Sequence, residues 1–179
     1  MSDRTEGRKR KLVIVDELKS MQRQVEMLNV QGHFIPHYVV PIVGDGGCLF
    51  AALSFLIFRT QQMARKVRTE IATYVVNNWP TFSILSHDAM GDNYINETYY
   101  WSDMSQPYTY GGLCELVAAG QIYPFFFEVY RDGQLFTHAG KPTFPVRRLK
   151  FSHDLSSGHF DAYEVETSTP QLQSEQTEG

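Results

Sequence analysis

The periodicity of the apolar residues changes near residue 120, and this change constrains the fold more than any other feature of the sequence. Before it, apolar residues recur at steps of three and four, the spacing of one face of a helix. After it come four short segments rich in aromatic and β-branched residues, which are typical of strands: "IYPFFFEVY", "QLFTHAG", "TFPVRRLKF" and "HFDAYEV". Helices followed by a block of strands favour an α+β fold over a doubly wound sheet, in which the two alternate.

Individual elements can be assigned from local patterns. Five apolar residues at helical spacing predict an amphipathic helix over 13–29: Ile14, Leu18, Met21, Val25 and Leu28. Four more elements follow along the chain: a strand at 37–43, helices at 48–58 and 61–77, and a short helix within 94–105. Another helix follows the Gly-Gly turn at 111–112 and ends near Gly120, a plausible C-cap. Arg131-Asp132-Gly133 predicts a hairpin, because glycine supplies the positive φ of a tight turn.

The domain organisation follows from length and local composition. A chain of 179 residues without repeats suggests one domain with flexible ends. Residues 1–12 are polar and basic and are expected to be a flexible terminus, although "RKRK" at 8–11 also fits a nuclear-import or acid-binding patch. Residues 166–179 lack core-forming side chains and are expected to be a disordered polar tail. The folded domain is therefore expected to cover residues 13–165.

Composition argues against several classes of protein. The net charge of −4 disfavours a general nucleic-acid binder, which usually carries a basic excess. The longest apolar runs, such as "CLFAALSFLIF", are too short to span a bilayer. The start lacks the pattern of a secretory signal, so an intracellular location in cytoplasm or nucleus is expected, and a Cys48–Cys114 disulfide is not. Two cysteines and scattered histidines give no zinc-ligand spacing, so no metal or other cofactor is expected.

The stretch "GDGGCLFAALS" at 44–54 places Cys48 between a glycine-rich turn and an apolar helix. At a helix N-terminus, unpaired N–H groups and the helix dipole favour the thiolate, which is the nucleophilic form. The N–H groups of such a turn can also hold a developing oxyanion, and Gly46 and Gly47 leave room for a substrate. Taken alone, the pattern more often marks a small core residue at the start of a buried helix.

A nucleophilic cysteine needs a base, and His159 is the best-placed histidine of the six in the chain. It opens a strand-like segment, and Asp161 follows two positions later, on the same face of a strand. Asp161 could therefore orient the imidazole while the other ring nitrogen faces the sulfur. The alternative is a surface strand that carries polar residues on its outer face.

Three blocks of the sequence resemble, in order, the signatures of the ovarian tumour (OTU) family of cysteine proteases: "GDGGCLFAAL", "YGGLCELVAAG" and "GHFDAYE". The resemblance covers about residues 37–165. The wider run "YGGLCELVAAGQIYPFFFEVYR" also looks like OTU domains of viruses and mobile elements. The fold that this resemblance implies is α+β and related to papain, with helices packed around a small, mostly antiparallel sheet.

The resemblance also implies a role for individual residues. Cys48 matches the nucleophile, His159 the general base, and Asp161 the acid that orients that base. Asp45 matches the acid of the cysteine turn, which shapes the oxyanion loop and in some members supports the triad. The implied oxyanion site consists of the backbone of Asp45, Gly46, Gly47 and Cys48.

Four more positions match or depart from the family pattern. Gly111, Gly112 and Glu115 match the block that packs the central helix beside the site, and Glu115 is interpreted as structural. Gly47 departs from the pattern, because the family usually has Asn before the nucleophile, and this puts the turnover rate in question. Cys114, between apolar neighbours, is interpreted as a core residue.

The expected function is therefore that of a deubiquitinase, which hydrolyses isopeptide or peptide bonds at the C-terminus of ubiquitin or a ubiquitin-like protein. The expected partner is ubiquitin or polyubiquitin, without nucleic acid or membrane, and the protein is expected to be a monomer. Two alternatives remain. One is an OTU-fold module that binds ubiquitin with little or no catalysis, and the other is a domain that processes a viral or mobile-element polyprotein in cis.

Overall fold

Six strands form one sheet in the part of the chain that the structure describes. The structure is a computed structural model that describes residues 23–153 and 158–165. The strands are β1 (Val25–Val30), β2 (His33–Val40), β3 (Phe126–Arg131), β4 (Gln134–Ala139), β5 (Val146–Ser152) and β6 (His159–Val165). Their order in the sheet is β1-β2-β6-β5-β3-β4, and every neighbouring pair is antiparallel except β3 and β5. The predicted α+β fold with a mostly antiparallel sheet is confirmed.

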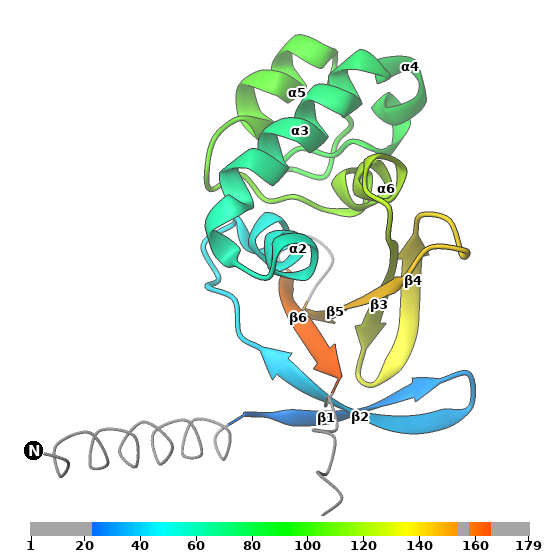
Figure 1. Ribbon diagram of the computed structural model, residues 1–179. Helices are drawn as coiled ribbons and strands as arrows, with labels where there is room; N and C mark the ends of the chain where they lie inside the picture. The colour runs from blue at the N-terminus through cyan, green and yellow to red at the C-terminus, as the bar shows by residue number, and fades with distance from the viewer. Residues whose placement is uncertain (1–22, 154–157, 166–179) are drawn as a thin grey trace, which may run out of the picture.

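The helices lie together on one side of the sheet, and α2 and α6 pack most closely against the strands (Figure 1). The helical elements are α2 (Cys48–Phe58), the 3₁₀ turn η1 (Gln61–Met63), α3 (Ala64–Asn77), α4 (Trp79–Phe82), the 3₁₀ turn η2 (Ser83–Leu85), α5 (Glu97–Met104) and α6 (Leu113–Ile122). The helices predicted at 48–58, 61–77 and within 94–105 are confirmed, with the first turn of the second in 3₁₀ form. The α4–η2 stretch was not predicted.

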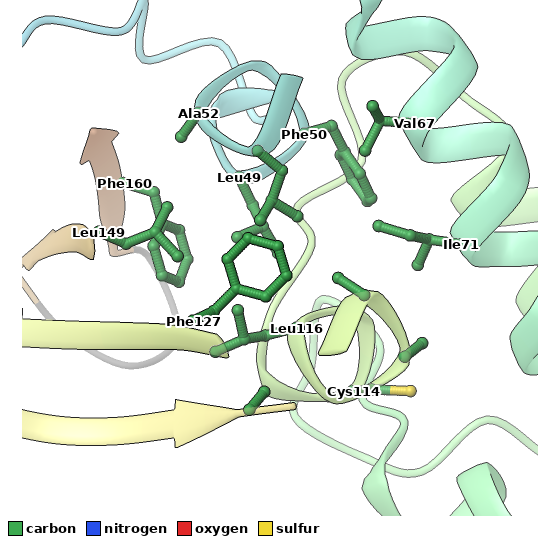
Figure 2. Packing of buried hydrophobic residues seen from close by; sticks show 14 of the residues in the cluster. Leu49, Phe50, Ala52, Val67, Ile71, Cys114, Leu116, Phe127, Leu149 and Phe160 are labelled. Carbon is green, nitrogen blue, oxygen red and sulfur yellow. The ribbon is translucent and has the colours of Figure 1, made fainter. Parts of the chain in front are cut away.

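The main core lies between the sheet and the helices. Leu49 and Phe50 of α2 point into it, where they meet side chains from α3, α6 and the strands: Val67, Ile71, Leu116, Phe127, Leu149 and Phe160 (Figure 2). Helix α2 is apolar on nearly every side because it is enclosed by both the sheet and α3. Each such side chain contributes about 1.5–3 kcal/mol through burial. The first turn of α2, which begins at Cys48, is therefore fixed firmly.

The helix predicted over 13–29 is wrong at its C-terminal end, because Val25–Val30 form β1. Residues 13–22 lie outside the described part of the chain. Strand β1 forms a hairpin with β2, and the turn residues Gln31 (φ 52°) and Gly32 (φ 86°) both have positive φ. The Gly32 N–H donates to Asn29 Oδ1 at 2.9 Å. The spacing of apolar residues in this segment fits a strand as well as a helix. Pairing with β2 therefore decides that the segment is a strand. The predicted strand at 37–43 is confirmed only as part of β2, which ends at Val40.

Gly120 is not the C-cap of α6, which continues to Ile122 and has Tyr123 at its C-cap. A Cβ atom on Gly120 would lie 2.4 Å from the Gly140 backbone nitrogen. Glycine at this position therefore serves close packing of the helix against the end of β4 rather than helix termination. The predicted hairpin at 131–133 is confirmed: it joins β3 to β4, with positive φ at Asp132 and Gly133.

The sheet curls until its first and last strands meet. The Asn29 N–H donates to the Gly133 carbonyl at 2.8 Å, and Asn29 Nδ2 donates to Gln134 Oε1 at 3.0 Å. The curl encloses a second, smaller apolar cluster: Leu28, Val39, Tyr130 and Tyr163. His37 is buried close to this cluster, edge-on to Tyr163.

Candidate active site

Cys48 is the first residue of α2 and follows a tight turn. Gly46 has φ +87°, and Gly47, the N-cap residue, has φ −88° and ψ 7°. The Gly47 N–H donates to Asp45 Oδ1 at 2.9 Å, and the Gly47 carbonyl accepts from the Ala51 N–H at 3.1 Å. The Asp45 side chain therefore holds the turn, while the Gly47 carbonyl starts the helix. The sulfur is placed where the chain changes direction, as the sequence predicts.

The segment between α5 and α6 packs directly against this turn. A Cβ atom on Gly46 would lie 1.9 Å from the Tyr108 carbonyl oxygen, and one on Gly47 would lie 3.1 Å from the Pro107 carbonyl oxygen. Glycine at position 46 is thus required twice, by its positive φ and by the close approach of Tyr108. At position 47 the backbone angles suit any residue, but the space for a side chain is narrow.

Burial raises the pKa of the Cys48 thiol above its ordinary value, and the nearby charge of Asp45 acts in the same direction. Backbone hydrogen bonds from Phe160, Leu49 and Cys48 act to lower that pKa. Cys48 as a whole is 2% exposed. The amides at the start of α2 thus favour the thiolate as expected from the sequence, but burial outweighs them.

His159 and Asp161 lie on the same face of β6, and His159 Nε2 is 3.0 Å from Asp161 Oδ1. Their side chains are 21% and 14% exposed. Asp161 Oδ1 also accepts from the Ile42 N–H at 2.8 Å, which ties β6 to the segment that leads into the cysteine turn. Asp161 is therefore fixed in place by two hydrogen bonds.

The other ring nitrogen of His159 faces the cysteine turn. An ideal Cβ on Gly44 would lie 3.4 Å from His159 Nδ1. The backbone of Phe160, the residue after His159, acts to lower the pKa of the Cys48 thiol. With Nε2 directed at Asp161, Nδ1 is the ring nitrogen on the side of the cysteine turn. Asp45 is directed elsewhere, since its carboxylate binds the Gly47 N–H.

The Gly-Gly block completes the wall of the site. Tyr110 stacks on Phe160 with ring centroids 6.4 Å apart. A Cβ on Gly111 would lie 2.7 Å from the Phe50 ring, so glycine allows this block to contact α2. All three sequence blocks that resemble the OTU signatures are thus brought together.

Glu115 and Cys114 lie in the interior beside the site. Glu115 is buried and accepts from the Gly112 N–H at 2.7 Å and from the Tyr100 hydroxyl at 2.9 Å. These contacts cap α6, in agreement with a structural role. Cys114 is a buried member of the main core, and burial strongly raises the pKa of its thiol, with Glu115 adding to the effect.

Sequence reasoning missed Arg68, a buried cation on α3 that reaches the back of the cysteine turn. In the sequence, burial of Arg68 is indicated only by its position next to Val67. The same helix also carries the exposed Arg65 and Lys66. Across residues 23–153 and 158–165, no group of three or more His, Cys, Asp or Glu side chains could hold a metal ion. Over the same residues, no helix has the length and apolar character needed to cross a bilayer.

Comparison with known proteins agrees with this geometry. The family model described as "OTU-like cysteine protease" matches residues 43–147. The OTU domain-containing protein 1 of Mus musculus is 26% identical over 168 residues, and that of Homo sapiens is 25% identical over 166 residues. These matches cover 90% and 89% of this chain but 34% and 32% of those proteins. The chain thus spans about a third of the length of the curated relatives it matches.

Solved structures share the fold. The OTU domain of OTUD1 superposes with a TM-score of 0.58 at 23% identity, covering 72% of this chain and 85% of that one. An Ovarian Tumor (OTU) domain in complex with ubiquitin gives 0.58 at 20% identity, with 78% and 75% covered. The viral OTU domain protease of Dera Ghazi Khan virus gives 0.57 at 19% identity, with 82% and 97% covered. At these identities the likeness shows the fold.

Proposed function

Because the chain belongs to the OTU-like cysteine protease family, we propose that it is a cysteine-dependent deubiquitinase. It would hydrolyse isopeptide or peptide bonds at the C-terminus of ubiquitin or a ubiquitin-like protein. The observation that carries the proposal is the direction of the His159 ring, with Nε2 bound to Asp161 and Nδ1 facing the turn that ends at Cys48. The choice of substrate is supported by two fold neighbours whose structures contain ubiquitin, an OTU domain and the Hazara virus OTU.

The reaction begins with transfer of the Cys48 proton to His159 Nδ1. The thiolate attacks the carbonyl carbon of the scissile bond, and the electron pair moves to the carbonyl oxygen. The N–H groups of Gly46 and Cys48 would hold this oxyanion, whereas the Gly47 N–H donates to Asp45 Oδ1. The positive charge on the imidazole is balanced by Asp161.

The second half of the reaction returns the enzyme to its starting state. The imidazolium gives its proton to the leaving amine, the C–N bond breaks, and a thioester remains on Cys48. His159 then takes a proton from water, and the resulting hydroxide attacks the thioester. Release of the carboxylate product and return of the proton to sulfur complete the cycle.

The pKa of the Cys48 thiol is raised by burial, which disfavours the charged form. We therefore expect the thiolate to form together with substrate binding and attack. The same observation favours the second candidate, a module that binds ubiquitin without turning it over.

A ubiquitin carrying a C-terminal propargylamide separates the two candidates. We expect intact mass spectrometry to show a one-to-one adduct with the unmodified chain and with Cys114→Ala, and none with Cys48→Ala. Ubiquitin–fluorophore hydrolysis should follow the same pattern. A folded chain that binds ubiquitin but forms no adduct would contradict the protease function and support the binding module.

A further inference from the structure

Arg68 is a buried cation that the proposed reaction does not use. It is 4% exposed and lies on α3, with its guanidinium 4.0 Å from the centre of the Phe50 ring. Nη1 donates to the Met104 carbonyl at 3.1 Å, and Nη2 donates to the Pro107 carbonyl at 2.8 Å. Within the described ranges, no carboxylate lies at ion-pair distance from it. Burying a charge is costly, and here the cost is offset by the two carbonyl groups and by the charge of the buried Glu115 carboxylate.

The backbone held by Arg68 is the one that supports the cysteine turn. The Pro107 carbonyl oxygen, which accepts from Arg68, would lie 3.1 Å from a Cβ on Gly47, and the neighbouring Tyr108 carbonyl closes on Gly46. Arg68 Nη2 itself would lie 3.6 Å from that Cβ on Gly47. The guanidinium thus lies behind the turn. The Pro107 carbonyl group accepts its hydrogen bond and also lies close to Gly47.

The contact between Arg68 and the Phe50 ring is a second link to the nucleophile, because Phe50 belongs to the helix that begins at Cys48. Phe50 is in the first turn of α2, two residues after Cys48, and its ring lies against the guanidinium. Burial lowers the pKa of Arg68, and among the nearby charges that oppose this effect the buried Glu115 carboxylate is the largest, followed by Asp45 and, more weakly, by an ionised Cys48.

We propose that Arg68 is a positioning residue for the nucleophile. It holds residues 104–108 against the Gly46–Gly47 turn, and its charge favours the negative charge that forms on Cys48 and on the oxyanion. Arginine suits both tasks, because its planar fork reaches two carbonyl groups while its face stacks on an aromatic ring. Lysine would keep the charge but lose the fork. The role in turnover rests on the proposed function, whereas the effect on the sulfur does not.

The first test measures Cys48 alone and needs no substrate. The rate of iodoacetamide alkylation of the Cys48 peptide is followed against pH for the parent, Arg68→Met and Arg68→Lys. Arg65→Met is the matched control, since Arg65 is exposed on the same helix. We expect Arg68→Met to raise the pH midpoint by about one unit, the lower end of the range for loss of a nearby opposite charge. Arg68→Lys and Arg65→Met should stay within a few tenths of the parent.

The second test measures turnover of a ubiquitin–fluorophore conjugate. Arg68→Lys should lower kcat by about 10- to 100-fold, the scale expected when a reacting group is misplaced by an ångström, with KM within about threefold of the parent. Arg65→Lys should leave both constants unchanged. Circular dichroism confirms folding, and Arg68→Gln replaces Arg68→Met if the latter does not fold.

Two results would overturn the proposal: an unchanged alkylation midpoint in a folded, uncharged Arg68 variant, or an unchanged kcat in Arg68→Lys. A parent chain that cleaves no ubiquitin conjugate would contradict the proposed function, while the alkylation test of Arg68 would still decide this inference.

Discussion

His159 Nε2 lies 3.0 Å from Asp161 Oδ1, and the same carboxylate oxygen accepts from the Ile42 N–H. The imidazole is thereby fixed to β6 and, through Ile42, to the segment that precedes the cysteine turn. Asp45, the other acid of the site, binds the Gly47 N–H instead. We therefore expect the two carboxylates to have different tasks, with Asp161 orienting the proposed base and Asp45 shaping the turn.

This difference predicts an order of effects on ubiquitin–fluorophore cleavage. His159→Ala removes the base and should reduce the rate by about 10²- to 10⁴-fold. Asp161→Asn keeps the shape but loses the charge that balances the imidazolium, so its loss should be smaller than that of His159→Ala. Asp45→Asn keeps an oxygen for the Gly47 N–H and should lose less than about tenfold.

The reverse order for the two acids, with Asp45→Asn severe and Asp161→Asn nearly silent, would assign the orienting role to Asp45. Full activity in a folded His159→Ala variant would falsify the mechanism. Circular dichroism of each variant provides the control for folding.

Asp45→Asn should also lower the pKa of the Cys48 thiol. The Asp45 charge opposes formation of the thiolate, so its removal makes ionisation of the sulfur easier. The pH midpoint of Cys48 alkylation should fall by less than about one unit, because burial is the larger cause of the raised pKa. Asp92→Asn, at an exposed loop position, is the matched control. A midpoint that rises or stays unchanged in Asp45→Asn would refute this electrostatic effect.

The two glycines of the turn should respond differently to alanine. Gly46→Ala meets both a φ of +87° and a Tyr108 carbonyl 1.9 Å from the new Cβ, so it should cost about 1–3 kcal/mol of stability and most of the activity. Gly47→Ala has an ordinary φ of −88° and needs the Pro107 carbonyl at 3.1 Å to move by only a few tenths of an ångström. It should keep activity within about fivefold. Melting temperatures and cleavage rates check both, and equal losses in the two variants would contradict this account.

The sequence predicts those parts of the structure that depend on local patterns. Helix α2 begins at Cys48 as expected, because a glycine turn followed by an apolar run is a local signal. The approach of His159 to Asp161 follows from the two-residue spacing on a strand. Strand β1 was missed because Val25 and Leu28 also fit a helix, and only the pairing with β2 decides between the two.

Features of the site that depend on distant segments could not be predicted in this way. Arg68 looks like a surface residue beside Lys66, and its acceptors, Met104 and Pro107, lie 36 and 39 residues later in the chain. The direction of the Cys48 pKa shift likewise depends on how deeply the packed helices bury the sulfur. Both are consequences of tertiary packing rather than of any short motif.

The last prediction concerns His37, which is 1% exposed in the curl of the sheet. With the proton on Nδ1, His37 donates to the Ile35 carbonyl at 3.0 Å, and its Nε2 faces Arg148 Nη1 at 3.4 Å as an acceptor. Tyr163 lies edge-on to the ring, and Glu128 is the nearby acid that favours protonation. A second proton would place an N–H against the Arg148 guanidinium. Burial lowers the pKa of His37, and Arg148 adds to the effect.

The folded state should therefore lose stability in mild acid. Because the pKa of His37 is lowered on folding, the unfolded chain binds the proton first as pH falls below about 6.5, and the free energy of unfolding decreases from there until the folded-state pKa is passed. The loss should be about 1.4 kcal/mol for each unit by which folding lowers this pKa. His37→Asn keeps a donor for Ile35 but cannot titrate, so the difference between its urea-unfolding free energies at pH 7 and pH 5 should be smaller than that of the parent. His33, exposed on the same strand, provides the control as His33→Asn, which should retain the pH dependence of the parent. If His37→Asn and the parent lose the same free energy between these pH values, His37 is not the group that makes the fold sensitive to acid.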